Sequence, residues 1–176
     1  EPSFEPEAEI FTIYEQGEEV LQSDSTLAQA SLLVEAADGG DVLTADALRE
    51  WHAASTRVSS EETNQAHLVD RFDTDTATAV PGVLSIADIV DNAIAGGLAG
   101  ASDADVKTAL SAVLSDDSPF AEMRYTLSEQ ATSVEGTAGT VWAAPAFTAQ
   151  VVYDTATFVV NPAAEMWLRD VQGMFH

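Results

Sequence analysis

Carboxylates are the reactive groups that this chain carries in greatest number. Asp and Glu together supply 30 of the 176 residues, against six Lys and Arg. Paired carboxylates could bind a hard cation or carry out acid–base catalysis. With so many acids, however, any required spacing occurs somewhere in the chain, and no pair stands out as catalytic. The sequence therefore gives no positive support to an enzyme, and we expect no catalytic residue.

One acidic segment has a spacing that could suit a metal ion. Asp70, Asp73 and Asp75 could place three carboxylates around a hard cation. Calcium takes six to eight oxygen ligands and typically needs a glycine at the turn, and no glycine occurs between Asp70 and Pro81. A solvated acidic loop explains the segment better, so we expect neither a metal ion nor a cofactor.

Neither the histidines nor any familiar catalytic motif indicates an active site. His52, His67 and His176 lie far apart in the sequence, and we expect His52 to be a partly buried packing residue on its helix. The chain has no cysteine, no glycine-rich phosphate loop, no nucleophile elbow and no His-Glu-x-x-His pair. The absence of cysteine excludes disulfides, thiolate metal sites and cysteine nucleophiles.

The three tryptophans could stack on a ligand. Trp51 and Trp167 fall on apolar helix faces, which favours core packing for both rings. Trp142 follows a glycine-rich turn and is the better candidate for an exposed ring.

The acidic charge is best explained by the solvent. The net charge is -24, yet 46% of the residues are hydrophobic, which excludes a disordered acidic tail. Such a surface repels itself, but at about 1 M salt the Debye length falls to about 3 Å. We therefore expect a protein of a halophilic archaeon. The same charge excludes nucleic acid as a partner, disfavours anionic lipid headgroups, and favours a neutral or cationic ligand over an anion.

Capping residues and hydrophobic periodicity predict the elements that position these side chains. Thr44, Ser85 and Ser102 each have the features of a helix N-cap, and Asp88 follows Ser85 at capping-box spacing. Gly96 and Gly97 then end the helix that Ser85 begins. We expect strands over residues 27–36 and 146–154, and helices over residues 7–22, 44–57, 85–96, 103–114, 120–127 and 162–175.

These elements predict one α+β domain over residues 1–176. It would have an entry helix within residues 1–25. A polar insertion would cover residues 59–79, with a short helix around 65–72. A helical insertion would cover residues 98–140, with a turn at 135–140. The two strands should pair in a small, mainly antiparallel sheet, with helices 44–57 and 162–175 on one face. A ferredoxin-like β-α-β-β-α-β plan, a split βαβ unit with extra helices, fits if its last strand lies beyond His176 and another is too short to detect.

Two segments resemble a known family in their order and spacing. Residues 41–49, DVLTADALR, follow a predicted strand, and residues 80–89, VPGVLSIADI, come about 30 residues later. This succession resembles the first large extracytoplasmic loop of resistance-nodulation-division (RND) exporters, in their MMPL-like and Patched-like branch. Residues 3–6, SFEP, are similar to the exit from the first membrane helix of that family. The resemblance covers most of residues 1–94 and, more loosely, residues 146–175.

The resemblance implies a porter-type domain of a proton-driven membrane exporter, on the extracytoplasmic face of the cell membrane. Its partners would be the membrane helices of the same full-length chain, a second porter repeat or neighbouring subunits, and a lipid or other hydrophobic small-molecule substrate. It implies no catalytic residue in this domain.

Two other classes of protein remain open. A free-standing secreted or surface binding protein of α+β fold would explain the acidic coat equally well. A hydrolase would need two carboxylates in one cleft, at least one of them desolvated.

Overall fold

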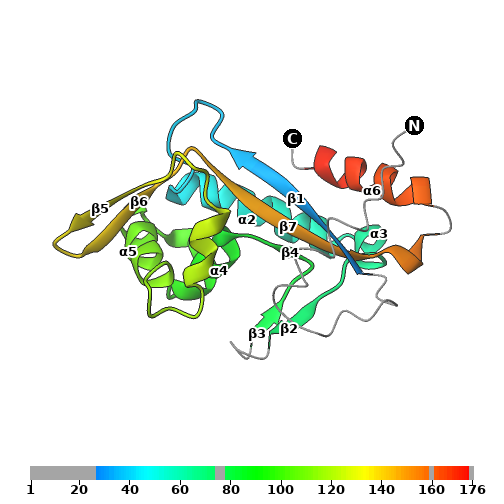
Figure 1. The fold of residues 1–176 in the computed structure, drawn as a ribbon, viewed down its shortest axis with the longest axis horizontal. Helices are drawn as coiled ribbons and strands as arrows, with labels where there is room; N and C mark the ends of the chain where they lie inside the picture. The colour runs from blue at the N-terminus through cyan, green and yellow to red at the C-terminus, as the bar shows by residue number, and fades with distance from the viewer. Residues whose placement is uncertain (1–26, 74–77, 159–160, 175–176) are drawn as a thin grey trace.

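The computed structural model describes residues 27–73, 78–158 and 161–174 and confirms the α+β class (Figure 1). Its central sheet has the strand order β1-β7-β4, formed by β1 (Leu27–Glu35), β7 (Ala146–Asp154) and β4 (Val83–Leu84). Both outer strands pair antiparallel with β7, and Leu32 of β1 lies opposite Ala149. The predicted pairing of the two long strands is therefore confirmed.

The connection between the outer strands gives the sheet its topology. Since β1 and β4 are both antiparallel to β7, they are parallel to each other, and helix α2 (Ala45–Ser60) lies between them in the chain. This is a split βαβ unit with β7 inserted at its centre. Helix α6 (Asn161–Gly173) follows β7, as the ferredoxin-like plan requires. Strand β4 has two residues, too few to be detected in the sequence. No strand follows α6 within the described residues.

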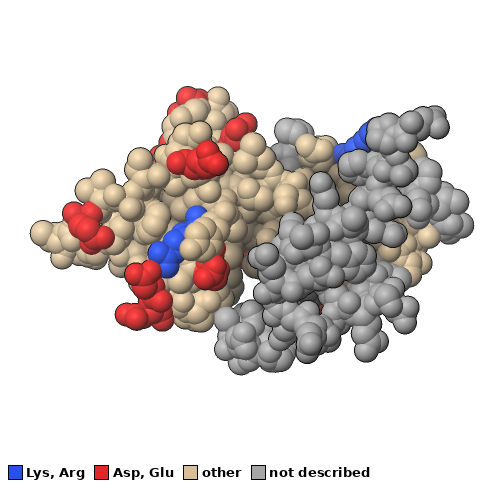
Figure 2. All heavy atoms as spheres, in the orientation of Figure 1, with Lys and Arg blue, Asp and Glu red and all other residues tan. Residues whose placement is uncertain are grey.

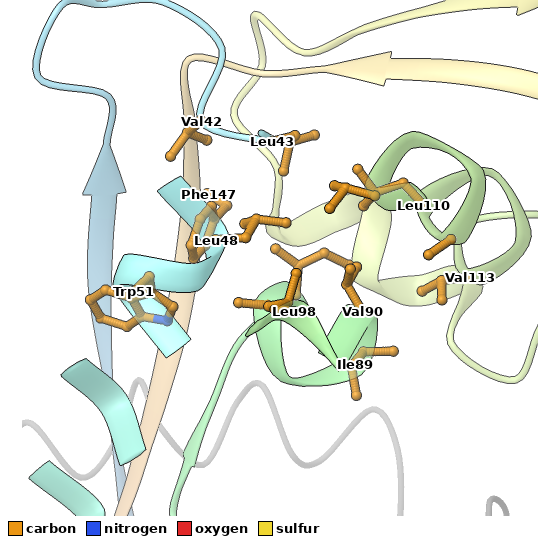
Figure 3. Close-up of a cluster of buried hydrophobic side chains, with 14 of the residues drawn as sticks. Val42, Leu43, Leu48, Trp51, Ile89, Val90, Leu98, Leu110, Val113 and Phe147 are labelled. Atoms are coloured by element: carbon orange, nitrogen blue, oxygen red, sulfur yellow. The ribbon is translucent and has the colours of Figure 1, made fainter. Parts of the chain in front are cut away.

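Helices α2 and α6 cover one face of β7, as predicted. Phe147 and Ala149 at one end of the strand belong to a core cluster with residues of α2, α4 (Ile86–Ala93) and α5 (Asp103–Val113). Val151 and Tyr153 at the other end pack against Trp167 and other residues of α6. These four strand residues alternate with Thr148, Gln150 and Val152 and so point to one side of the sheet. Figure 3 shows the first cluster converging from α2, α4, α5 and the sheet.

The predicted helix starts are present as hydrogen-bonded caps. The Thr44 hydroxyl accepts from the Ala47 N–H at the start of α2, at 3.4 Å. Ser85 and Ser102 begin α4 and α5 with complete capping boxes, closed by Asp88 and Asp105. Each box satisfies backbone N–H groups that a helix start leaves without partners.

The structure corrects the interpretation of residues 59–79. Helix α2 continues to Ser60, the short helix α3 lies at Glu62–Gln65 and not around 65–72, and β2 (Arg71–Asp73) pairs with β3 (Thr78–Val80) as a hairpin. The chain leaves the helical conformation because it pairs with β7: the Val69 N–H donates to the Val152 carbonyl at 3.0 Å, and the Asp154 N–H donates to the His67 carbonyl at 2.9 Å. Tertiary pairing thus overrides the local polar composition.

Residues 98–140 are helical only in their first part. They contain the 3-10 turn η1 (Leu98–Gly100), helix α5 and the 3-10 helix η2 (Ala121–Thr126), where an α-helix was predicted over 120–127. The predicted turn over residues 135–140 is present as the tip of a hairpin between β5 (Thr132–Gly136) and β6 (Gly139–Ala143), two strands that were not predicted; the hairpin projects from the body in Figure 1. All residues of β5 are exposed, so its sequence lacks an alternating apolar signal. The predicted entry helix within residues 1–25 lies outside the described residues.

The acidic residues are spread over the surface. Figure 2 shows groups of Asp and Glu side chains scattered over the described part of one face, with few Lys or Arg side chains among them. On this face the acidic side chains therefore do not gather into one patch.

Candidate functional site

A groove among the described residues lies between α2, α4 and η2 and has a volume of about 630 Å³. Its floor comes from the segment that leads into α4. The residues that line it are His52, Ser55, Thr56, Ser59, Ser60, Gln65, Pro81, Val83, Leu84, Asp88, Ile89, Asp91, Asn92, Pro119, Phe120, Glu122 and Met123. A volume of this size is in the range of small-molecule sites, which span about 300–1,000 Å³.

A buried hydrogen-bond chain fixes the two helices that form the groove. The Trp51 indole N–H of α2 donates to the Ser85 hydroxyl at 2.9 Å, and that hydroxyl donates to Asp88 Oδ2 at 2.9 Å. The Ser85 N–H also donates to Asp88 Oδ2, at 2.7 Å. Trp51 itself packs edge-on against Phe147 of β7. The start of α4 is therefore held against α2 by the same residues that cap the helix.

One end of the groove places an imidazole between two carboxylates. His52 Nδ1 lies 3.1 Å from Asp88 Oδ1, and His52 Nε2 lies 3.6 Å from Asp91 Oδ2. The second carboxylate is held in place because Asp91 Oδ1 accepts the Leu98 N–H at 2.7 Å. Gly97 has a φ of 74°, and a Cβ there would come within 2.8 Å of Asp91 Oδ1. Glycine at this position thus permits both the positive φ of the turn and the close approach of the Asp91 carboxylate.

The remainder of the groove is mainly apolar. Val83 and Ile89 form buried parts of its wall, and Phe120 and Met123 face them from the segment around η2. Glu122 stands on the η2 side. No Lys or Arg occurs among the described lining residues, so His52 is their single potential cation.

Among the described lining elements, Ser85 is not placed as a nucleophile with His52 as its base. The Ser85 hydroxyl donates to Asp88 and accepts from Trp51 and from the Ala87 N–H, and it is fully buried. It does not contact His52, which a nucleophilic serine would require. The groove instead offers apolar walls with a few fixed polar groups at one end, the usual composition of a ligand site.

Of the three acidic residues considered as metal ligands, the structure describes only the side chain of Asp70. Asp70 Oδ1 accepts the Gly82 N–H at 2.8 Å, which is a structural role. The side chain of Asp73 and all of Asp75 lie outside what the structure describes. No group of three or more metal-ligating side chains occurs in the described part of the chain.

The tryptophans divide largely as expected. Trp51 and Trp167 are buried in the two core clusters, as predicted. Trp142, predicted as the better candidate for exposure, is half-buried against the first cluster, and its Nε1 is buried without a hydrogen-bond partner among the described residues. Trp142 is nevertheless the most exposed of the three tryptophans, as predicted, and the packing of β6 against α5 accounts for its partial burial.

His52 is partly buried, as predicted, but it also bonds to Asp88 in the groove. Asp91 and Glu122 were not singled out at all, since they are two among 30 acids. The one available signal was the i, i+3 spacing of Asp88 and Asp91, which puts both on one side of α4.

Comparison with models of protein families, with curated proteins and with solved structures finds no match to this chain. Within the described residues, no helix is both long enough and apolar enough to cross a membrane.

Proposed function

We propose that this chain is the extracytoplasmic porter-type domain of an RND exporter of the MMPL-like and Patched-like branch, in a halophilic archaeon. The domain would offer part of the path for lipids or other hydrophobic substrates at the extracytoplasmic face of the cell membrane. It would carry out no catalysis of its own. Its partners would be the membrane helices of the same full-length chain and a second porter repeat or neighbouring subunits.

One observation supports this proposal: the helices that begin in the two segments resembling the exporter family, α2 and α4, line the same groove. Residues 41–49 begin α2, which contributes His52 and Ser55 to the lining. Residues 80–89 contribute Pro81, Val83 and Asp88. Residues 41–49 themselves do not line the groove, but they begin the helix that does, and a substrate path through the domain would use such a shared cavity.

The apolar lining and the sheet topology add support. Val83, Leu84, Ile89 and Phe120 suit a hydrophobic substrate. The split βαβ unit is the arrangement that the predicted elements led us to expect, and it is compatible with a porter-type domain.

A free-standing secreted or surface binding protein would use the same groove and is the alternative. Sequencing the gene on both sides of this segment separates the two. The exporter requires membrane spans immediately before Glu1 and after His176. A signal peptide or lipid anchor upstream, with a stop codon soon after His176, would establish the binding protein instead.

A further inference from the structure

We infer that the groove between α2, α4 and η2 selects amphiphiles that carry a protonated amine, with the amine at Asp88 and Asp91 and the apolar body along Val83, Ile89 and Phe120. This inference rests on the proposed function for its biological role, as the substrate site of an exporter. The binding step itself rests on the groove alone.

The Asp91 carboxylate, beside Asp88 at the end of the groove, is placed to receive a donor. Both oxygens of Asp88 and one oxygen of Asp91 already have partners in Ser85, His52 and Leu98. Asp91 Oδ2 faces His52 at 3.6 Å, beyond ordinary hydrogen-bond distance, and the Asp91 side chain is 28% exposed. This oxygen has the capacity to accept a hydrogen bond from a ligand, and an ammonium group has three donors.

Charge complementarity determines which ligand fits. The described lining has three carboxylates, Asp88, Asp91 and Glu122, and no Lys or Arg. The charges of the three carboxylates and His52 sum to -3 if His52 is neutral and to -2 if it is protonated. A protonated amine is therefore attracted in either state. A carboxylate or phosphate ligand would face like charges without a basic side chain to compensate them.

At high salt, ligand selectivity depends on direct contact between the ligand and the carboxylates of the groove, and not on the net charge of the protein. The net charge of -24 attracts any cation at long range, but at about 1 M salt the Debye length is about 3 Å. Under those conditions only groups in direct contact discriminate between ligands. Partly buried carboxylates such as Asp88 and Asp91 are screened less than those on the open surface.

Three ligands with the same apolar body test the inference: a naphthylhexyl amine, the corresponding alcohol and the corresponding carboxylate. Their binding to the purified chain is followed by naphthalene fluorescence anisotropy in 2 M KCl at neutral pH, below the concentration at which they aggregate. We expect the amine to bind about three- to fivefold more tightly than the alcohol, and the carboxylate to bind most weakly.

Two variants locate the effect, and a third controls for charge. Asp91→Asn keeps an oxygen for the Leu98 N–H but removes the negative charge, and Glu122→Gln changes an exposed side chain on the other wall. Glu50→Gln removes the same charge from an exposed position of α2 outside the groove. Asp91→Asn and Glu122→Gln should each reduce the preference for amine over alcohol at least twofold, and Glu50→Gln should leave it unchanged.

Equal affinities for the three ligands would overturn the inference, and so would an equal loss of preference in all three variants. Because Glu122→Gln alters no described hydrogen bond, it remains informative if Asp91→Asn fails to fold. The result for amine selectivity can be separated from the result for the proposed exporter function. Membrane spans beside the segment without amine selectivity would leave an exporter of other substrates, and amine selectivity without spans would leave a free-standing amine-binding protein.

Discussion

At the residue scale, the only lysine of the chain has a structural task. Lys107 of α5 donates to Asp41 Oδ2 and to the Trp142 carbonyl. Asp41 Oδ1 also accepts the N–H groups of Leu43 and Ala144, each at 3.0 Å. This carboxylate therefore joins the segment before α2, helix α5 and the loop between β6 and β7.

The environment of Asp41 gives a pH-dependent contribution to stability. Burial disfavours its charged form, but the hydrogen bonds from Lys107, Ala144 and Leu43, together with the lysine charge, outweigh burial and lower the pKa of Asp41. A carboxyl group whose pKa is lower in the folded state stabilises that state above its unfolded pKa, about 3.9. This contribution is lost as the pH falls through the lower, folded pKa.

We predict that Asp41→Asn lowers the free energy of unfolding by about 1–2 kcal/mol at pH 7, since it loses a charge-assisted bond at a partly exposed site. The difference from the natural chain should shrink as the pH falls below about 4, because the carboxyl group is then protonated. Urea unfolding in molar KCl at several pH values measures it. Asp117→Asn, on the exposed turn after α5, is the control and should have little effect. A difference that is independent of pH would contradict this account.

The residues of the groove were harder to predict than those of the core. Trp51 and Trp167 were placed correctly because apolar side chains at helical spacing form one helix face, which is usually buried in the core. Asp91 was missed because its role depends on the Leu98 N–H and His52, which come from other segments. In a chain with 30 acids, position in space and not residue type distinguishes those that line a groove.

At the scale of elements, two capping boxes with the same chemistry lie in different environments. Ser85 at the start of α4 is fully buried and also accepts the Trp51 indole N–H. Ser102 at the start of α5 is exposed and serves its own helix. Loss of the first hydroxyl would leave a buried indole N–H without that partner, in addition to the lost cap.

We therefore predict that Ser85→Ala lowers the free energy of unfolding by about 2–3 kcal/mol and Ser102→Ala by about 1 kcal/mol. The two substitutions remove the same atoms from the same type of cap, so each is the control for the other. Chemical unfolding of both variants in the same buffer measures the difference. Equal losses would mean that the bond between α2 and α4 contributes nothing beyond the cap.

Elements with strong local signals were predicted, and those formed by tertiary contacts were not. The helices that begin at Thr44, Ser85 and Ser102 have caps that can be identified in the sequence alone. The two-residue strand β4 exists because β7 lies beside it, and β5 has no buried side chain to mark it. The split βαβ topology was nevertheless anticipated, because β7 and α6 have clear patterns of their own.

At the scale of the whole molecule, the acidic surface sets the conditions under which the fold is stable. Thirty acids and six Lys and Arg give a net charge of -24, and Figure 2 shows several separate acidic groups on the described part of one face. The described ion pairs, such as that of Arg124 with Asp116, compensate only a few of these charges. Mutual repulsion therefore opposes the compact state unless ions screen it.

We predict that the melting temperature rises by about 5–10 °C between about 0.1 M and about 2 M KCl, as expected for about 2–3 kcal/mol in a chain of this length. Differential scanning calorimetry measures it. An uncharged osmolyte at equal osmolality is the control and should produce a smaller rise. A melting temperature that stays level or falls with added KCl would contradict the interpretation of the charge as an adaptation to salt.

The central claim, that this chain is one domain of a membrane exporter, is tested most directly by locating the protein in the cells that produce it. An antibody raised against residues 27–174 is used on fractions prepared in molar salt. We predict a band far above the 18.6 kDa of this segment, present in the membrane fraction and retained there after an alkaline wash. A band near 18.6 kDa in the medium, or one that the wash releases from the membrane, would contradict the account.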